Sequence, residues 1–107
     1  MLLAQKGYRV LLVDKATFPS DIMSTHYIHP RGVAHLKRWG VLEHVIDSNC
    51  PPVSRATFDL GPLALVAETL PEDGVAAAYV PRRTVLDTIL VDAAVRSGVE
   101  LGEAFSV

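Results

Sequence analysis

The sequence lacks several features that would assign a protein to a class at once. It has a single cysteine, Cys50, so it cannot form an internal disulfide and gives no indication of an oxidising compartment. Its net charge is only −2, which gives no electrostatic reason to expect nucleic acid or an anionic membrane as a partner. No apolar run approaches the length of a membrane span, and no basic segment precedes the first apolar residues as in a signal peptide. A cytoplasmic location is the default expectation.

Familiar catalytic and metal-binding motifs are also missing. There is no Gly-x-Ser-x-Gly segment of a serine hydrolase. His26 and His29 straddle a loop and a proline, with no second ligand pair at the spacing of structural zinc, so we predict no metal site. Cys50 precedes two prolines and has no neighbour that would activate it. The sequence therefore identifies no catalytic residue.

A helix–glycine–strand pattern opens the chain. Residues 1–6 resemble the end of a helix, with Lys6 in the last turn and Gly7 directly after it. Residues 8–13 then read Tyr-Arg-Val-Leu-Leu-Val. A continuous apolar run of this kind predicts a parallel strand that is covered on both faces.

The same pattern returns near the end of the chain. Thr84 is the predicted N-cap of a helix, and Asp87 three residues later would complete an imperfect capping box. A buried stripe and a stop at Ser97-Gly98 follow, and residues 99–101 predict a second strand. Two helix–glycine–strand units in 107 residues indicate an α/β fold with a parallel sheet.

The middle of the chain has a different pattern. Residues 16–29 form a polar loop, and Pro30 is suited to the first position of a helix that Gly40 would end. A short amphipathic turn runs to about Ser48. From residue 54 the period of the apolar residues changes to two, which predicts short strands at 54–60, 63–67 and 75–80 in a small antiparallel sheet. We predict a Rossmann-like core at 1–50 and 82–107 and a strand insert at 53–81.

Asp14 is the most informative single residue. An acid at the carboxyl end of the second strand of a dinucleotide-binding unit accepts hydrogen bonds from ribose hydroxyls, a task that suits a carboxylate because it offers only acceptors. The glycine fingerprint G-x-G-x-x-G belongs about 20 residues earlier, which falls before Met1. We therefore expect the chain to begin just after that loop. The alternative is an ordinary solvated acid that follows a strand.

Further cofactor-binding candidates surround this acid. Lys15 is the next residue, and Ser24, Thr25 and His26 lie in the polar loop that we expect to pass the adenosine side of a nucleotide. Arg83 stands at a strand-to-helix junction, where its fork of donors suits a phosphate or a ring. The alternative for Ser24, Thr25 and His26 is an ordinary surface loop. The alternative for Arg83 is a surface arginine that pairs with Asp87.

Three segments together resemble the FAD-dependent oxidoreductases of the para-hydroxybenzoate hydroxylase and geranylgeranyl reductase type. They are residues 7–15 with the ribose acid, the loop and helix of residues 18–42 with their Leu-x-x-x-Gly-hydrophobic-Leu ending, and Arg82-Arg83-Thr84-Val85-Leu86-Asp87 with the residues to Val99. The resemblance spans nearly the whole chain. It implies a partial FAD-binding domain, FAD as cofactor, its ribose held by Asp14, and Arg83 near the isoalloxazine or the pyrophosphate. It also implies reduction of the flavin by NADH or NADPH and a small organic molecule as substrate.

Several alternatives stay open at this point. The parent protein is expected to be a monooxygenase or a reductase, and this chain alone, lacking the fingerprint, is expected to bind FAD weakly or not at all. The chain can also be an inactive truncated or split segment that needs a complementing fragment or forms a homo-oligomer. A third interpretation keeps an enzyme and replaces FAD by NAD or S-adenosylmethionine.

Overall fold

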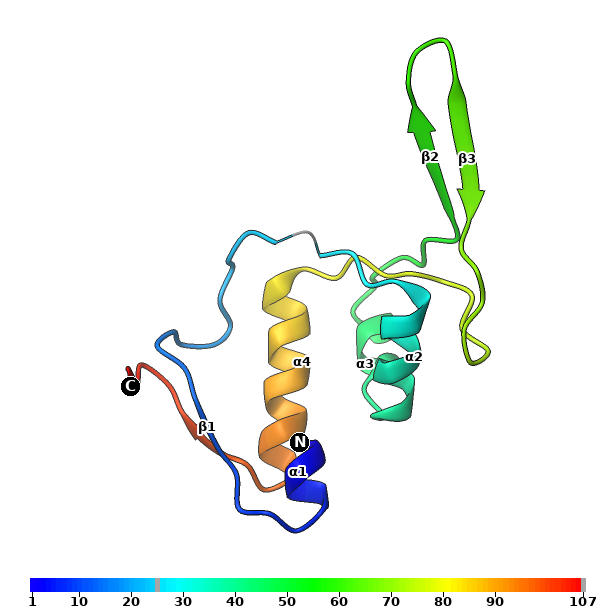
Figure 1. Ribbon diagram of the computed structural model, residues 1–107. Helices are drawn as coiled ribbons and strands as arrows, with labels where there is room; N and C mark the ends of the chain where they lie inside the picture. The colour runs from blue at the N-terminus through cyan, green and yellow to red at the C-terminus, as the bar shows by residue number, and fades with distance from the viewer. Residues whose placement is uncertain (25, 107) are drawn as a thin grey trace. The chain divides into compact units, whose positions relative to one another are not determined.

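The computed structural model describes residues 1–24 and 26–106. The elements in chain order are α1 (Leu2–Gln5), β1 (Leu11–Val13), α2 (Pro30–Arg38), α3 (Leu42–Asp47), β2 (Arg55–Asp59), β3 (Ala64–Glu68), α4 (Arg83–Arg96) and β4 (Glu100–Gly102) (Figure 1). Across the described ranges, no helix is long and apolar enough to cross a bilayer.

The chain divides into two compact units, which are described separately. The first comprises Met1–Ser24 and Arg82–Val107, and the second comprises Thr25–Pro81. The first contains the parallel strand pair and the second contains the antiparallel one. The domain boundaries expected from the sequence stay a prediction.

In the first unit, β1 and β4 pair in parallel with Leu11 opposite Glu100, Leu12 opposite Leu101 and Val13 opposite Gly102. This is the strand pairing that the two helix–glycine–strand patterns predicted. The strands are shorter than expected, because residues 8–10 lie before the first ladder pair.

The glycines at the two helix ends explain why the same pattern occurs twice. Gly7 has φ +87° and Gly98 has φ +89°, a left-handed backbone that glycine adopts without a side-chain clash. Tyr8 N–H donates to Leu3 O and Gly7 N–H donates to Ala4 O, and Val99 and Gly98 make the equivalent bonds at the end of α4. These are Schellman motifs, which satisfy the last helix carbonyls and turn the chain into a strand.

Two predictions about the first unit are wrong. The capping box does not form: α4 begins at Arg83 with Arg82 as its N-cap, and no side chain in the described part caps it. Asp87 instead accepts hydrogen bonds from the Arg83 guanidinium, because a charged fork of donors competes well with a backbone N–H. In β1, Leu11 is 64% exposed and Leu12 is 38% exposed, so the described residues do not cover this strand on both faces.

In the second unit, α2 and α3 form the centre of the core. Pro30 occupies the first turn of α2, as predicted, and Gly40 with φ +72° follows its end. The side chains of Val33 and Val45 are fully buried. The rest of this core comes from α2, α3, the connection between them and the segment that follows β3, namely Ala34, Leu36, Val41, Leu42, Val75, Ala78 and Tyr79.

The strand predictions in the second unit are confirmed for two of the three segments. β2 and β3 form an antiparallel hairpin with Arg55 opposite Glu68 and Asp59 opposite Ala64. Residues 75–80 do not form a third strand. They make isolated bridges, in which Tyr79 pairs with Ile28 and Ala78 pairs with Val53. Val75, Ala78 and Tyr79 are buried in the core of this unit, whereas Val80 is 44% exposed. Every residue of this segment is apolar, so its composition indicated burial and did not specify a ladder.

Candidate functional site

Asp14 lies directly beyond the carboxyl end of β1, where the sequence predicted it. Its backbone N–H donates to Gly102 O at 3.0 Å, and its carbonyl accepts from Phe105 N–H at 2.9 Å. Both bonds join Asp14 to the end of β4 and the residues after it. The acid is therefore held in the ladder at the tip of the parallel pair, and the side chain starts from a fixed backbone position.

The carboxylate of Asp14 has one local role. Its Oδ1 accepts a hydrogen bond of 2.8 Å from Ala16 N–H, two residues on, which is an Asx turn that shapes the loop after the strand. Within the described part of the chain, Oδ2 accepts no hydrogen bond. Asp14 is half-buried. A carboxylate with one oxygen engaged and one available acceptor, at a strand tip, matches the chemistry that a ribose hydroxyl needs.

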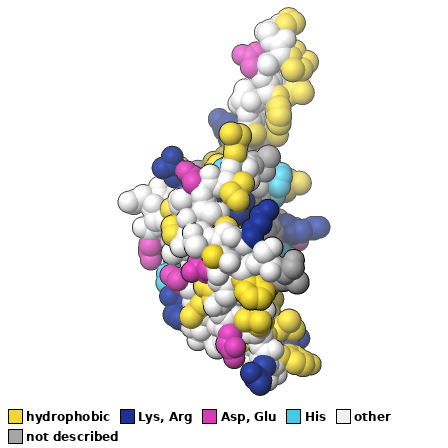
Figure 2. Space-filling model, turned by 90° about the vertical axis from the view of Figure 1, so that its left-hand side faces the viewer, with side chains coloured by type: hydrophobic (Ala, Val, Ile, Leu, Met, Phe, Trp, Pro, Cys, Tyr) yellow, Lys and Arg dark blue, Asp and Glu magenta, His cyan; other side chains and the backbone are white. Residues whose placement is uncertain are grey.

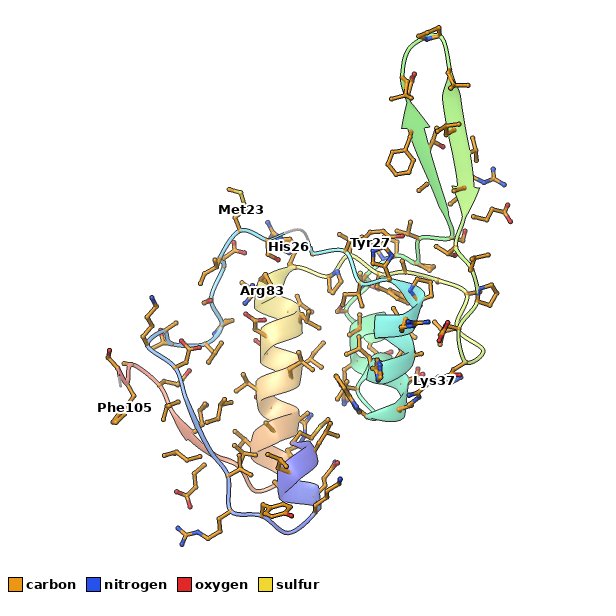
Figure 3. The ribbon with its side chains drawn as sticks, in the orientation of Figure 1. Met23, His26, Tyr27, Lys37, Arg83 and Phe105 are labelled. Atoms are coloured by element: carbon orange, nitrogen blue, oxygen red, sulfur yellow. The ribbon has the colours of Figure 1, made fainter. Side chains whose placement is uncertain are left out.

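The loop after Asp14 is tied to the chain that follows β4. Phe18 N–H donates to Glu103 Oε1 at 2.6 Å, and Ala104 N–H donates to Ala16 O at 3.2 Å. Figure 3 places Phe105 in this C-terminal segment. Sequence reasoning missed this contribution, because Glu103 is distant in the sequence and belongs to no motif. Lys15 is exposed within the same loop.

Arg83 begins α4 (Figure 3) and lies in the same unit as Asp14. The tight Schellman turn makes α4 run opposite to β4, so the start of α4 and the carboxyl ends of both strands lie toward the same end of the unit. That end of a parallel sheet is where ligands bind in open α/β folds. In the structure as described, no hydrogen bond or ion pair joins Asp14 to Arg83.

The Arg83 side chain is paired with Asp87, which was the alternative that the sequence offered. Arg83 Nε lies 3.0 Å from Asp87 Oδ1, and a terminal nitrogen lies 2.8 Å from Oδ2. Hydrogen bonding to Asp87, followed by the charge of that carboxylate, raises the pKa of the Arg83 guanidinium above its ordinary value, and burial acts weakly in the other direction. The guanidinium is thus a permanent cation whose fork is occupied by one neighbour.

The candidates in the polar loop fall on both sides of the division between the units. Ser24 closes the first stretch of one unit and His26 belongs to the other. His26 has a left-handed backbone with φ +55°. Thr25, the candidate between them, lies outside the described residues. The structure brings Asp14, Lys15 and Arg83 into one unit, and it makes no statement about how His26 lies relative to them.

A cavity lies within the second unit, which contains α2, α3 and the hairpin. It is an open cavity of about 580 Å³ between the start of α2 and the hairpin, with Tyr27, Phe58 and Leu70 among its lining residues. Tyr27 and His29 make an edge-to-face ring contact with centroids 4.7 Å apart. One sequence signal points to this feature, because the period of two places Ala56 and Phe58 on one face of a strand. No group of three or more metal-ligating side chains occurs among residues 1–24 and 26–106.

The first unit pairs two parallel strands and places an acid, Asp14, directly after the first of them. Two solved structures are similar to the chain in fold. A FAD-dependent halogenase from a myxobacterium, the chondrochloren halogenase, matches with a TM-score of 0.84 at 24% identity over 94% of this chain and 24% of its own length. A flavoprotein/dehydrogenase from Cytophaga hutchinsonii matches with a TM-score of 0.83 at 26% identity over 98% of this chain and 27% of its own.

These likenesses confirm the predicted fold class, a partial Rossmann-like α/β domain with parallel strands and a small antiparallel sheet. The chain spans about a quarter of the length of each of the two proteins. No protein-family model and no curated protein sequence matches the chain.

Proposed function

We propose that this chain is part of a flavin-dependent oxidoreductase and contributes the acid that holds the adenosine ribose of FAD. The observation that carries the proposal is the position of Asp14, at the tip of a parallel strand pair in a fold shared with two flavoproteins. The residues present fit the cofactor, because an available carboxylate oxygen at this place is the acceptor that a ribose diol requires.

Each candidate residue has a distinct share in this proposal. Asp14 accepts from the ribose, while its other oxygen keeps the Asx turn in place. Lys15 supplies a cation near the phosphates, and Ser24, Thr25 and His26 supply polar groups on the adenosine side. Arg83 reaches the pyrophosphate or the flavin ring, which requires that its fork be shared with or released from Asp87.

The wider activity is proposed on the same basis. FAD supplies the redox chemistry when it is bound, and the protein supplies binding and orientation. NADH or NADPH is the proposed reductant, a small organic molecule is the proposed substrate, and the activity of the whole protein is monooxygenation or reduction, as in the para-hydroxybenzoate hydroxylase and geranylgeranyl reductase type. Neither nucleic acid nor a membrane is a proposed partner.

The test is a titration of the ¹⁵N-labelled chain, followed by NMR. Millimolar binding is measurable in this way, and we expect weak binding because the sequence contains no glycine fingerprint. FAD should shift the amide signals of residues 14–16. ADP contains the same ribose and diphosphate and should shift the same signals, whereas FMN lacks the adenosine and should leave them in place.

Two results would contradict the proposal. The first is a set of FAD-induced shifts that omits residues 14–16, which would remove Asp14 from the site. The second is a higher affinity for NAD or S-adenosylmethionine than for FAD, which would replace the cofactor. For the intact protein that carries this chain, the corresponding measurement is the visible absorption spectrum, because bound flavin absorbs visible light.

A further inference from the structure

The β2–β3 hairpin exposes most of its residues, several large apolar side chains among them. Four of the five β2 residues and all five β3 residues are exposed, and Phe58, Leu65 and Val66 are each more than half exposed. The hairpin extends away from α2 and α3 within its unit (Figure 1), and hydrophobic side chains line it (Figure 2). In the part of the chain that the structure describes, no further strand pairs with this hairpin. A two-stranded ribbon alone is marginally stable in water, so this ribbon is suited to a partner.

The hydrogen-bond pattern shows which backbone groups are available to that partner. Thr69 N–H donates to Ser54 O, and Leu60 N–H donates to Leu63 O. Because hydrogen-bonded and non-hydrogen-bonded pairs alternate in an antiparallel ladder, Ala56 and Phe58 direct their backbone groups toward β3. The alternate residues of β2 direct theirs to the outer edge, and these are Arg55, Thr57 and Asp59. In the described sheet, β2 has β3 as its one neighbour.

The side chains on this outer edge are complementary to themselves. When β2 lies antiparallel to a copy of itself with Thr57 opposite Thr57, Arg55 of each copy lies opposite Asp59 of the other. All three pairs are then of the hydrogen-bonded kind, since these are the residues whose backbone groups point outward. Opposite charges directly across a ladder are favourable and like charges are unfavourable.

We propose that the chain forms a two-fold symmetric dimer through the β2 edges, giving a four-stranded antiparallel sheet in the order β3–β2–β2–β3. An edge-to-edge contact of this kind is self-complementary, as a two-fold axis requires. The dimer places an acid, a base and an acid in a row across the sheet: Glu68 and Arg55 of one copy, which already form an ion pair of 3.1 Å, and Asp59 of the other.

Other registers and the other edge fit less well. In any other register that still pairs the outward backbone groups of β2, the two-fold axis moves from Thr57 to another residue. Such a register makes fewer than three hydrogen-bonded pairs, and Arg55 no longer lies opposite Asp59. The outer edge of β3 presents Ala64, Val66 and Glu68. This edge can pair with itself, but it offers no charge that complements Glu68. The charge pattern therefore selects β2.

The apolar face of the ribbon becomes broader in the same dimer. Ala56 of each copy lies opposite Phe58 of the other, on the face away from the charged row. The two Phe58 side chains, 62% exposed in the single chain, then belong to one sheet face twice as wide. The cross-strand contact of each Phe58 with Ala56 of the other copy and six new backbone hydrogen bonds would both favour association.

A proline exchange distinguishes the two edges with matched substitutions. Thr57→Pro removes the central outward N–H of β2 without removing a β2–β3 hydrogen bond, because proline lacks a donor and is tolerated on edge strands. Val66→Pro is the control, since Val66 is the ladder partner of Thr57 and points its N–H to the opposite edge. We expect sedimentation velocity of the full chain to show a dimer for the wild type and Val66→Pro and a monomer for Thr57→Pro. A monomeric wild type, or dissociation by Val66→Pro alone, overturns the proposal.

A charge exchange tests the register and does not depend on proline. Arg55→Asp places two acids opposite each other, and Asp59→Arg places two bases opposite each other, so each variant alone should dimerise about tenfold more weakly. Mixed together, the two variants are complementary at both pairs and should form a heterodimer with an affinity close to that of the wild type. Absence of recovery in the mixture shows that these residues do not face each other and overturns the register.

A crosslink provides a measurement that requires no equilibrium constant. Opposed residues of a hydrogen-bonded pair have Cα atoms about 5.5 Å apart, within the range that a disulfide spans. In a Cys50→Ser background, Thr57→Cys should form a covalent dimer under mild oxidation, and Val66→Cys should not. Equal crosslinking by both variants would assign the contact to random collision and reject the dimer.

Discussion

Replacement of Asp14 by asparagine and by alanine separates its structural role from its proposed role in binding. Asn retains an oxygen that can accept the 2.8 Å hydrogen bond from Ala16 N–H, because both Asp and Asn form Asx turns. Ala removes that acceptor. A net hydrogen bond contributes about 1 kcal/mol, so Asp14→Ala should lower the free energy of unfolding by about that amount. Asp14→Asn should change it by less than about 0.5 kcal/mol.

The effects on binding should differ in the opposite sense. A charge-assisted hydrogen bond is roughly twice as strong as a neutral one, so loss of the charge alone should weaken FAD binding about tenfold. Asp14→Asn should therefore be a binding variant with nearly normal stability. Urea unfolding followed by circular dichroism gives the free energies, and the NMR titration of residues 14–16 gives the affinities.

The reasoning fails if Asp14→Asn binds FAD as well as the wild type does, because the carboxylate would then serve the turn alone. It also fails if Asn and Ala lower the stability equally, since the Asx turn would not account for the effect. Asp47→Asn is a suitable reference, because it makes the same chemical change at an exposed acid of α3 for which no role in binding is proposed.

Three further predictions concern the scaffold. Val45→Ala removes two buried methyl groups from a fully buried side chain and should cost about 2 kcal/mol in urea unfolding; a change below about 0.5 kcal/mol would contradict the packing described here. Gly98→Ala should cost about 1–2 kcal/mol through backbone strain alone, because φ is +89° while the added Cβ meets no atom within 4 Å; an unchanged midpoint would show that the turn is not left-handed. Arg83→Lys keeps the charge and loses the fork to Asp87, so amides in the first turn of α4 should exchange faster with solvent. Asp87 raises the pKa of Arg83, so the stabilisation from this pair is complete below the pKa of the unfolded guanidinium and is lost only as the pH rises through the pKa of the folded state. The stability of the wild type relative to Arg83→Lys should therefore not vary across neutral pH. A variation there would refute the pairing.

Local sequence patterns predicted the elements whose ends carry unambiguous residues. Gly7 and Gly98 marked the two helix ends, and Pro30 marked the start of α2, because each of these residues is suited to one backbone conformation. The parallel pairing of β1 and β4 followed from the repeated order of helix, glycine and strand. The position of Asp14 at the strand tip followed in turn, since it is the first polar residue after the apolar run.

The failures of prediction occurred where one residue had several possible partners. Asp87 was expected to complete a capping box, but the guanidinium of Arg83 one turn earlier is a stronger donor. Residues 75–80 form an apolar run like a short strand, but Val75, Ala78 and Tyr79 are buried in the core of the helical unit and the segment makes isolated bridges. The exposure of Leu11 depends on which elements cover the sheet, which an apolar run cannot specify.

The two backbone hydrogen bonds of Asp14, to Gly102 and from Phe105, have a consequence for variation in length. Side chains alternate between the two faces of a strand, so a ladder displaced by one residue turns every side chain to the opposite face. One residue inserted into or deleted from the Ser97–Val99 turn would displace β4 against β1 in this way. The shift would turn the β4 side chains over and move Gly102 and Phe105 away from the backbone groups of Asp14 that they bind. The fixed position of Asp14 thus depends on a turn at the opposite end of the strands, and the length of that turn should be as constant among working versions of this protein as the acid itself.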